Sequence, residues 1–161
     1  AKRTEPNRPG PAPSEAAEIG TAMHSYLALV DLSRETVDEE LIRQLPHAGE
    51  IRDMAAQYHG SELRARLAAA AALRREVPLT FVDDGAIVHG VVDLIVEESD
   101  GSTTVLDWKT DRLEMTEPEE RAEIYRSQLT SYGRGIQLAM GLKKAPETVV
   151  HFLRGNVTIG L

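Results

Sequence analysis

Three runs rich in β-branched residues lie in the middle of the chain, and they constrain its fold more than any other feature. The runs cover residues 77–82, 87–96 and 103–108. Asp-Gly pairs at 84–85 and 100–101 separate them. β-Branched residues favour strands, and an Asp-Gly pair between two strands favours a tight hairpin turn. The sequence therefore predicts an antiparallel meander of three strands.

Helical patterns flank this block on both sides. Apolar residues between Ser14 and Leu32 recur at helical spacing, and Ser14 is placed to cap the helix that they predict. The other predicted elements are helices over 36–45, 61–74 and 119–140, and one or two last strands at 149–153 and 157–159. The order is therefore helices, three strands, a helix and a strand, which indicates a chain of mixed α and β structure.

The first thirteen residues differ in composition from the rest. They hold four of the eight prolines in the chain. Proline-rich segments are extended and hold no core, so residues 1–13 are predicted to form a flexible tether before one folded domain over 14–161. A tether of this kind is expected where a domain is joined to a larger polypeptide.

Composition excludes several kinds of site. The 161 residues include no cysteine, so a thiolate nucleophile and an iron–sulfur cluster are excluded, and a reducing cytoplasm is the expected compartment. No apolar run approaches the roughly 20 residues of a membrane-spanning helix, so no membrane partner is expected. No Gly-x-x-x-x-Gly-Lys-[Ser/Thr] phosphate loop is present, so we expect no ATP site in this chain. A net charge of −8 argues against a surface that binds nucleic acid by phosphate neutralisation alone.

Two acidic residues stand where strands are otherwise apolar. Asp93 interrupts the run 91–96, and Asp107 follows two apolar residues in the next strand. Hairpin pairing could bring these carboxylates together, and Lys109 shares the face of Asp107 because residues two apart on a strand point the same way. Two close carboxylates repel unless a dication lies between them. The pattern therefore predicts an oxygen-rich site for Mg²⁺ or Mn²⁺.

Each of these residues also has a purely structural interpretation. Backbone amides or an arginine could satisfy Asp93, and Lys109 could be an ion-pair partner on a solvated edge strand. Arg121, Arg126 and Arg134 could meet phosphates, but a solvated polar helix face is the preferred interpretation of these three. The functional interpretation depends on a wider set of motifs.

Five short motifs follow one another along the chain. In order they are Gly20-Thr21-Ala22-Met23-His24, Glu76-Val77-Pro78-Leu79, Gly90-Val91-Val92-Asp93, Val105-Leu106-Asp107-Trp108-Lys109-Thr110-Asp111 and Gln128-Leu129-Thr130-Ser131-Tyr132. The series resembles the RecB-type nuclease family, a branch of the PD-(D/E)xK phosphodiesterases, and most closely the C-terminal nuclease domain of RecB/AddA-like helicase-nucleases. The resemblance covers about residues 17–155, so 14–161 would be a RecB-like nuclease domain. It implies an α/β fold with a restriction-endonuclease-like core, in which helices flank a central mixed β-sheet.

The resemblance also implies a metal site and a catalytic residue. His24, Asp93, Asp107 and the carbonyl of Trp108 would bind Mg²⁺ or Mn²⁺. Lys109 would be the catalytic lysine, which orients the attacking water or stabilises the developing negative charge. A mixed nitrogen and oxygen ligand set of this kind favours manganese more than an all-oxygen set would.

Three further residues acquire supporting roles by the same resemblance. Glu76 would act next to the metal ligands or at a second metal, although a charged strand end would also explain it. Gln128 and Tyr132 lie four apart on one helix face, where they would position the lysine, the metal shell or the DNA backbone. The chain departs from the family at Trp108, where tyrosine is usual, and at Ala28, where an acidic residue is common.

The implied reaction is hydrolysis of DNA phosphodiester bonds by a metal-dependent exonuclease. A helicase motor, in cis or in trans, would feed it single-stranded DNA during DNA end processing and recombinational repair. The alternative is a catalytically silent module that keeps the fold and binds DNA ends or braces a partner subunit.

Overall fold

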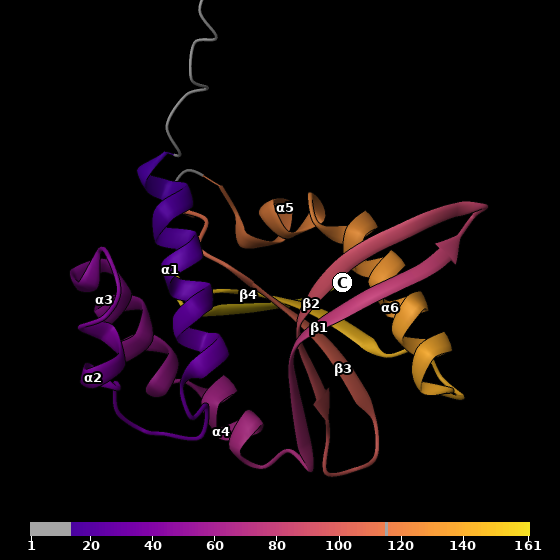
Figure 1. Ribbon diagram of the computed structural model, residues 1–161, viewed down its shortest axis with the longest axis horizontal. Coiled ribbons are helices and arrows are strands. Elements are labelled where there is room, and N and C mark those ends of the chain that lie inside the picture. The colour runs from indigo at the N-terminus through magenta and orange to yellow at the C-terminus, as the bar shows by residue number, and fades with distance from the viewer. Residues whose placement is uncertain (1–13, 115) are drawn as a thin grey trace, which may run out of the picture.

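A mixed β-sheet forms the centre of the molecule (Figure 1). The computed structural model describes residues 14–114 and 116–161, so the tether predicted over 1–13 lies outside the described residues. The strand order is β1-β2-β3-β4-β5, with β3 and β4 parallel and every other neighbouring pair antiparallel. The predicted meander is confirmed, and both of the last strands form. The strands are β1 (Ala72–Asp83), β2 (Ala86–Glu97), β3 (Thr103–Lys109), β4 (Glu147–Phe152) and β5 (Val157–Gly160).

Helices cover both sides of this sheet (Figure 1). One hydrophobic core joins the N-terminal helices to Leu94 and Leu106, and a second joins the last helices to Ile95 and Val105. The alternation is the one expected of strands buried on two faces. The predicted α/β fold with a central mixed sheet between helices is therefore confirmed. The helices are α1 (Glu15–Leu29), α2 (Glu39–Ile42), α3 (Ala48–His59), α4 (Glu62–Ala68), α5 (Pro118–Glu123) and α6 (Arg126–Met140).

Side chains satisfy the backbone at both ends of α1. Ser14 Oγ accepts a hydrogen bond of 3.2 Å from the amide of Ala17, as its predicted capping role requires. At the other end, Arg75 of β1 donates to the carbonyls of Leu27 and Ala28 at 3.2 and 3.1 Å. These bonds satisfy carbonyls that no helical amide can reach, and they tie α1 to the sheet.

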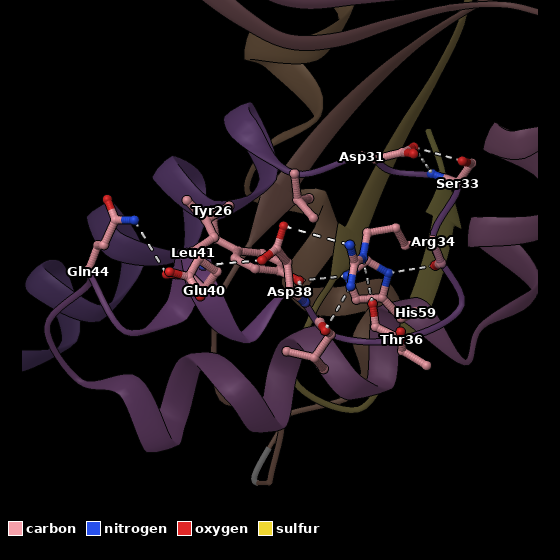
Figure 2. Close-up of polar contacts among 12 residues, drawn as sticks. Tyr26, Asp31, Ser33, Arg34, Thr36, Asp38, Glu40, Leu41, Gln44 and His59 are labelled. Atoms are coloured by element: carbon pink, nitrogen blue, oxygen red, sulfur yellow. Dashed lines mark hydrogen bonds and ion pairs between the residues drawn. The ribbon is translucent and has the colours of Figure 1, made fainter.

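A buried tyrosine–histidine contact ties α1 to α3 and to the loop that follows α1 (Figure 2). The Nδ1 of His59 lies 2.7 Å from the carbonyl oxygen of Arg34, so this nitrogen carries the proton and donates. The other ring nitrogen, Nε2, then accepts from the hydroxyl of Tyr26 at 2.7 Å. That hydroxyl accepts in turn from the amide of Asp38 at 3.1 Å. The chain of bonds fixes α1 in place without a charged group.

The predicted helix over 61–74 is too long. The helix ends at Ala68, and the next strand begins at Ala72. Leu73 pairs with Val96 in the β1–β2 ladder. The hydrogen bonds and burial gained in this ladder outweigh the helix propensity of the alanines, which is a weak preference.

Other helix bounds differ from prediction as well. The helix expected over 36–45 shrinks to α2, and the helix expected over 119–140 is interrupted at 124–125, between α5 and α6. The helix α3 was not predicted, although its buried residues carry a helical spacing that could have revealed it. No helix in the described part of the chain has the length and apolar character needed to cross a membrane. The buried residues of α3 are Ile51, Met54, Ala55, Tyr58 and His59.

Candidate active site

Side chains from one helix and two strands meet at one point of the sheet. His24 comes from α1, Asp93 from β2 and Asp107 from β3. Leu94 pairs with Leu106, so Asp93 and Asp107 occupy opposed positions one step further along the ladder. His24 Nε2 lies 3.3 Å from Asp93 Oδ2. The structure thus brings together the three side chains that the sequence motifs predict as metal ligands.

The backbone of Trp108 contacts the same atoms. Its amide donates to Asp93 Oδ2 at 2.8 Å, and its carbonyl oxygen lies 3.0 Å from Nε2 of His24. The other nitrogen of this ring, Nδ1, lies 3.1 Å from the carbonyl oxygen of Gly20. Both ring nitrogens therefore face oxygen acceptors, which favours the doubly protonated ring. The hydrogen bond with Asp93 raises the pKa of His24, although burial acts in the opposite direction.

The two carboxyl groups have opposite pKa shifts. Burial alone would raise the pKa of Asp93, but the hydrogen bond and charge of His24 hold it below its usual range. Burial raises the pKa of Asp107 to about 6, and the negative charge of Asp93 adds to this effect. Each carboxyl group has a cationic neighbour, His24 for Asp93 and Lys109 for Asp107, but burial and the charge of Asp93 outweigh the lysine at Asp107. Asp107 is therefore held in a site that disfavours its ionised form.

Lys109 lies between Asp107 and an aromatic ring. Its Nζ is 2.9 Å from Asp107 Oδ2 and 4.3 Å from the centroid of the Tyr125 ring. At 2.9 Å the ammonium and the buried Asp107 carboxyl group form a close ion pair. The lysine therefore joins the buried Asp107 carboxyl group to the ring of Tyr125.

The match to a family model decides the class of protein. The model of the PD-(D/E)XK nuclease superfamily matches residues 2–155. This chain belongs to the PD-(D/E)XK nuclease superfamily. The resemblance carried by the five motifs is confirmed, and so is the α/β fold expected for this superfamily.

Curated relatives of this nuclease-superfamily chain are subunits of ATP-dependent helicase/nucleases. It is 29% identical over 180 residues to one such subunit from Bacillus cereus (strain AH187), in a match that covers 89% of the chain and 14% of that protein. It is 30% identical over 174 residues to the corresponding protein of Bacillus cereus (strain Q1), and 28% identical over 183 residues to that of Bacillus mycoides (strain KBAB4). These matches cover 87% and 90% of the chain. The chain spans about 14% of the length of these relatives.

The donor groups of this PD-(D/E)XK site fit a hard divalent cation. Nucleases of the superfamily generally use divalent metals such as Mg²⁺. His24 Nε2 lies within contact distance of Asp93 Oδ2 and of the Trp108 carbonyl oxygen, and the buried carboxyl group of Asp107 is a further oxygen donor beside them. Within residues 14–114 and 116–161, however, no group of three or more His, Asp and Glu side chains is arranged to hold a metal ion as it stands. His24 would have to release the proton on Nε2 and exchange its contacts with Asp93 and Trp108 for the cation.

The two predicted residues of α6 contact each other. Gln128 Nε2 donates to the hydroxyl of Tyr132 at 3.3 Å. The Tyr132 ring lies against Gly90 of β2, where a β-carbon would come within 2.1 Å of the tyrosine hydroxyl oxygen. No hydrogen bond among the described residues joins this pair to Asp93 or Lys109. Their roles in this nuclease-superfamily site therefore remain a prediction.

Glu76 lies beside the acids, in an unusual backbone conformation. Its neighbours in β1 pair with Leu94 and Val92, which places Glu76 opposite Asp93. Its φ of 48° is in the left-handed region. Burial raises the pKa of its carboxyl group, and the negative charge of Asp93 raises it further. The predicted placement of Glu76 next to the metal ligands matches this geometry, while its role is untested.

A shallow pocket gives access to this side of the site. The pocket has a volume of about 340 Å³ and is lined by Thr21, His24, Ser25, Ala28 and Glu76. The family often has an acidic residue at the position of Ala28. In this chain the alanine leaves Glu76 as the acidic residue that lines the pocket beside His24.

The arginines of α5 and α6 form ion pairs with acidic side chains. Arg126 pairs with Glu123, and Arg134 pairs with Asp83. Arg121 pairs with Asp111.

Tyr125 also belongs to this site, although it was not predicted. Its spacing from Gln128 and Tyr132, three and seven residues away, is a helical spacing that could have indicated it, even though the helix is interrupted at 124–125.

Proposed function

We propose that this domain hydrolyses DNA phosphodiester bonds with the help of a divalent metal ion. The observation that carries the proposal is the meeting of His24 Nε2, Asp93 Oδ2 and the Trp108 carbonyl oxygen beside the buried carboxyl of Asp107. Membership of the PD-(D/E)XK nuclease superfamily supports the same reaction.

The residues divide into ligands and a cationic side chain. His24, Asp93, Asp107 and the Trp108 carbonyl would hold Mg²⁺ or Mn²⁺. The bound ion would polarise the scissile phosphate and lower the pKa of a water molecule. Lys109, with its ammonium against Asp107, would orient that water or stabilise the negative charge that develops at phosphorus. Glu76 would assist from the opposed position beside Asp93, and Gln128 with Tyr132 would hold the strand or the DNA backbone.

A helicase motor would supply the substrate. The relatives are named as parts of an ATP-dependent helicase/nuclease, which supports a motor in cis or in trans that feeds single-stranded DNA to an exonuclease. The net charge of −8 fits this arrangement, because a domain that receives threaded DNA needs little affinity of its own. We place this activity in DNA end processing and recombinational repair in the cytoplasm.

A second candidate is a catalytically silent module that binds DNA ends or braces a partner subunit. One observation favours it: no three metal-ligating side chains within the described ranges stand ready to hold an ion. Calorimetry with Mn²⁺ separates the candidates. Stoichiometric binding of Mn²⁺ that is lost in Asp93→Ala supports the nuclease. A folded domain that does not bind Mn²⁺ supports the catalytically silent module.

The direct test is cleavage of single-stranded DNA with Mn²⁺, Mg²⁺ or EDTA. The parent should cut with either metal and not with EDTA, and Asp107→Ala and Lys109→Ala should each lose about 10²-fold or more. Asp53→Ala and Lys143→Ala are matched controls on exposed residues and should cut as the parent does. Activity in EDTA, or full activity in either site variant, would overturn the proposal.

A further inference from the structure

Tyr125 contacts the ammonium of Lys109 but has no part in the proposed ligand set. Lys109 Nζ lies 4.3 Å from the ring centroid, within the range of a cation–π interaction. We infer that Tyr125 is a positioning residue, which holds the Lys109 ammonium over its ring beside Asp107. The inference rests on the proposed function, because it concerns how the lysine of that site is held.

Lys109 needs a second support besides Asp107. A lysine side chain loses up to about 2 kcal/mol of conformational entropy when it is held in one arrangement. The contact with Asp107 Oδ2 at 2.9 Å engages one of the three N–H donors of the ammonium, so this carboxylate alone does not fix its orientation. Asp107 is also a proposed metal ligand, and a cation there would compete with the ammonium for the same oxygen. The ring of Tyr125 attracts the ammonium without offering a charge that competes for the metal.

The ring is itself held in place. The hydroxyl of Tyr125 donates to Asp111 Oδ2 at 2.6 Å, and Arg121 Nε donates to the same oxygen at 2.6 Å. The Asp111 side chain is 12% exposed. Both bonds have charged partners and are short, which makes them stronger than ordinary hydrogen bonds. An aromatic ring fixed at its far end in this way can present its face to Lys109 in one orientation.

The break between α5 and α6 lies at Tyr125, the residue whose ring contacts Lys109. Tyr125 stands just before α6, and its amide donates to the carbonyl of Ala122 at 2.9 Å, a bond that spans three residues. A continuous helix would use bonds that span four residues and would turn the side chain to a different angle. The interruption of the predicted helix therefore has a local consequence, which is the tyrosine ring beside the lysine.

The inference is tested first without metal or DNA. The chain has four lysines, so selective ¹³C labelling of lysine gives few side-chain NMR signals, and Lys109→Arg identifies the one from Lys109. In EDTA the ε-methylene protons of Lys109 should lie upfield of those of the other lysines, because they sit over the ring. Tyr125→Phe should keep this shift and Tyr125→Leu should abolish it. A parent signal without the upfield shift, or one unchanged in Tyr125→Leu, would overturn the inference.

The second measurement is single-stranded DNA cleavage with Mn²⁺. Tyr125→Leu should lower kcat about tenfold with KM unchanged, and Tyr125→Phe should stay within about threefold of the parent, because it keeps the ring. Normal kcat in Tyr125→Leu would show that the contact has no catalytic value and would overturn the positioning role. Tyr125→Met, which fills much of the same volume without a ring, replaces Tyr125→Leu if that variant does not fold. If the parent does not cut DNA, both the proposed function and the catalytic role of Tyr125 are wrong. The NMR signal would still decide whether the Tyr125 ring holds Lys109.

Discussion

Glu76 of β1 lies directly opposite Asp93 of β2. At this pair, the strand face that packs against α1 becomes the face that packs away from it. Leu73 and Arg75 face α1, whereas Val77 and the other odd-numbered residues that follow it in β1 pack against α6. Alternation along a regular strand would put all of them on one face. Glu76 has a left-handed φ at this point, so backbone strain and the candidate site coincide.

Relieving this strain should stabilise the protein and damage the site. Glycine adopts a left-handed φ without the steric cost that a β-carbon brings, so Glu76→Gly should raise the free energy of unfolding by about 0.5–1 kcal/mol in urea titrations. The same variant should cut DNA more slowly, because the carboxyl group opposite Asp93 is gone. Asn156→Gly is the matched control, since Asn156 has a φ of 55° outside the site and should leave cleavage unchanged. A lower free energy of unfolding in Glu76→Gly would contradict the prediction that the backbone is strained at this residue.

Ionised Asp107 should lower the free energy of unfolding of the metal-free protein at neutral pH. Its pKa is raised to about 6, so the stability that its protonated form provides is present below its unfolded value of 3.8 and is lost as the pH rises through 6. Asp107→Asn cannot ionise, and in EDTA at pH 8 it should exceed the parent in free energy of unfolding by about 3 kcal/mol.

That advantage should shrink as the pH is lowered to 4, while cleavage is lost at every pH. Chemical denaturation of both proteins across this range checks the prediction, with Asp53→Asn as an exposed control. Equal stabilities at pH 8 would show that ionised Asp107 carries no net cost.

Gly90 should tolerate no side chain. A β-carbon there would lie 2.1 Å from the hydroxyl oxygen of Tyr132 and 2.5 Å from the ring carbon that bears it, so the ring must move. Gly90→Ala should therefore destabilise the protein by about 1–3 kcal/mol and slow cleavage if Tyr132 acts in the site.

The cost of Gly90→Ala should fall in a Tyr132→Leu background, which a double-mutant cycle measures. Gly49→Ala tests the general effect of the substitution, because a β-carbon at Gly49 meets no atom within 4 Å and should stabilise α3. Additive effects of Gly90→Ala and Tyr132→Leu would rule out the close contact as the cause.

His151 should make stability fall in mild acid. Burial lowers its pKa from 6.5 to about 4, and its Nε2 has no hydrogen-bond partner within the described residues. The unfolded chain therefore takes up a proton at this residue before the folded protein does, and stability is lost as the pH falls below 6.5. Between pH 7 and pH 5 the loss from this residue should be about 2 kcal/mol.

His151→Gln keeps a polar group next to Thr158 and should remove that part of the pH dependence. Urea titrations of both proteins at the two pH values give the difference in slope, in which the contributions of all other groups cancel. Parallel pH profiles would contradict the assignment.

The local signals of the sequence predicted most of the elements in their order, although not α3, and named most residues of the candidate site, although not Tyr125. β-Branched runs, Asp-Gly turns and a capped amphipathic helix depend on residues close together in the chain, and they predicted the meander and α1. The five motifs placed His24, Asp93, Asp107 and Lys109 in one family pattern.

Only the tertiary structure decided how these residues meet. The pairing of β1 with β2 set the left-handed turn at Glu76 and ended the alanine-rich helix early. The break before α6 and the bond to Asp111 put Tyr125 beside Lys109. Such features depend on contacts between segments far apart in the chain, whose energies exceed the local preferences that a sequence displays.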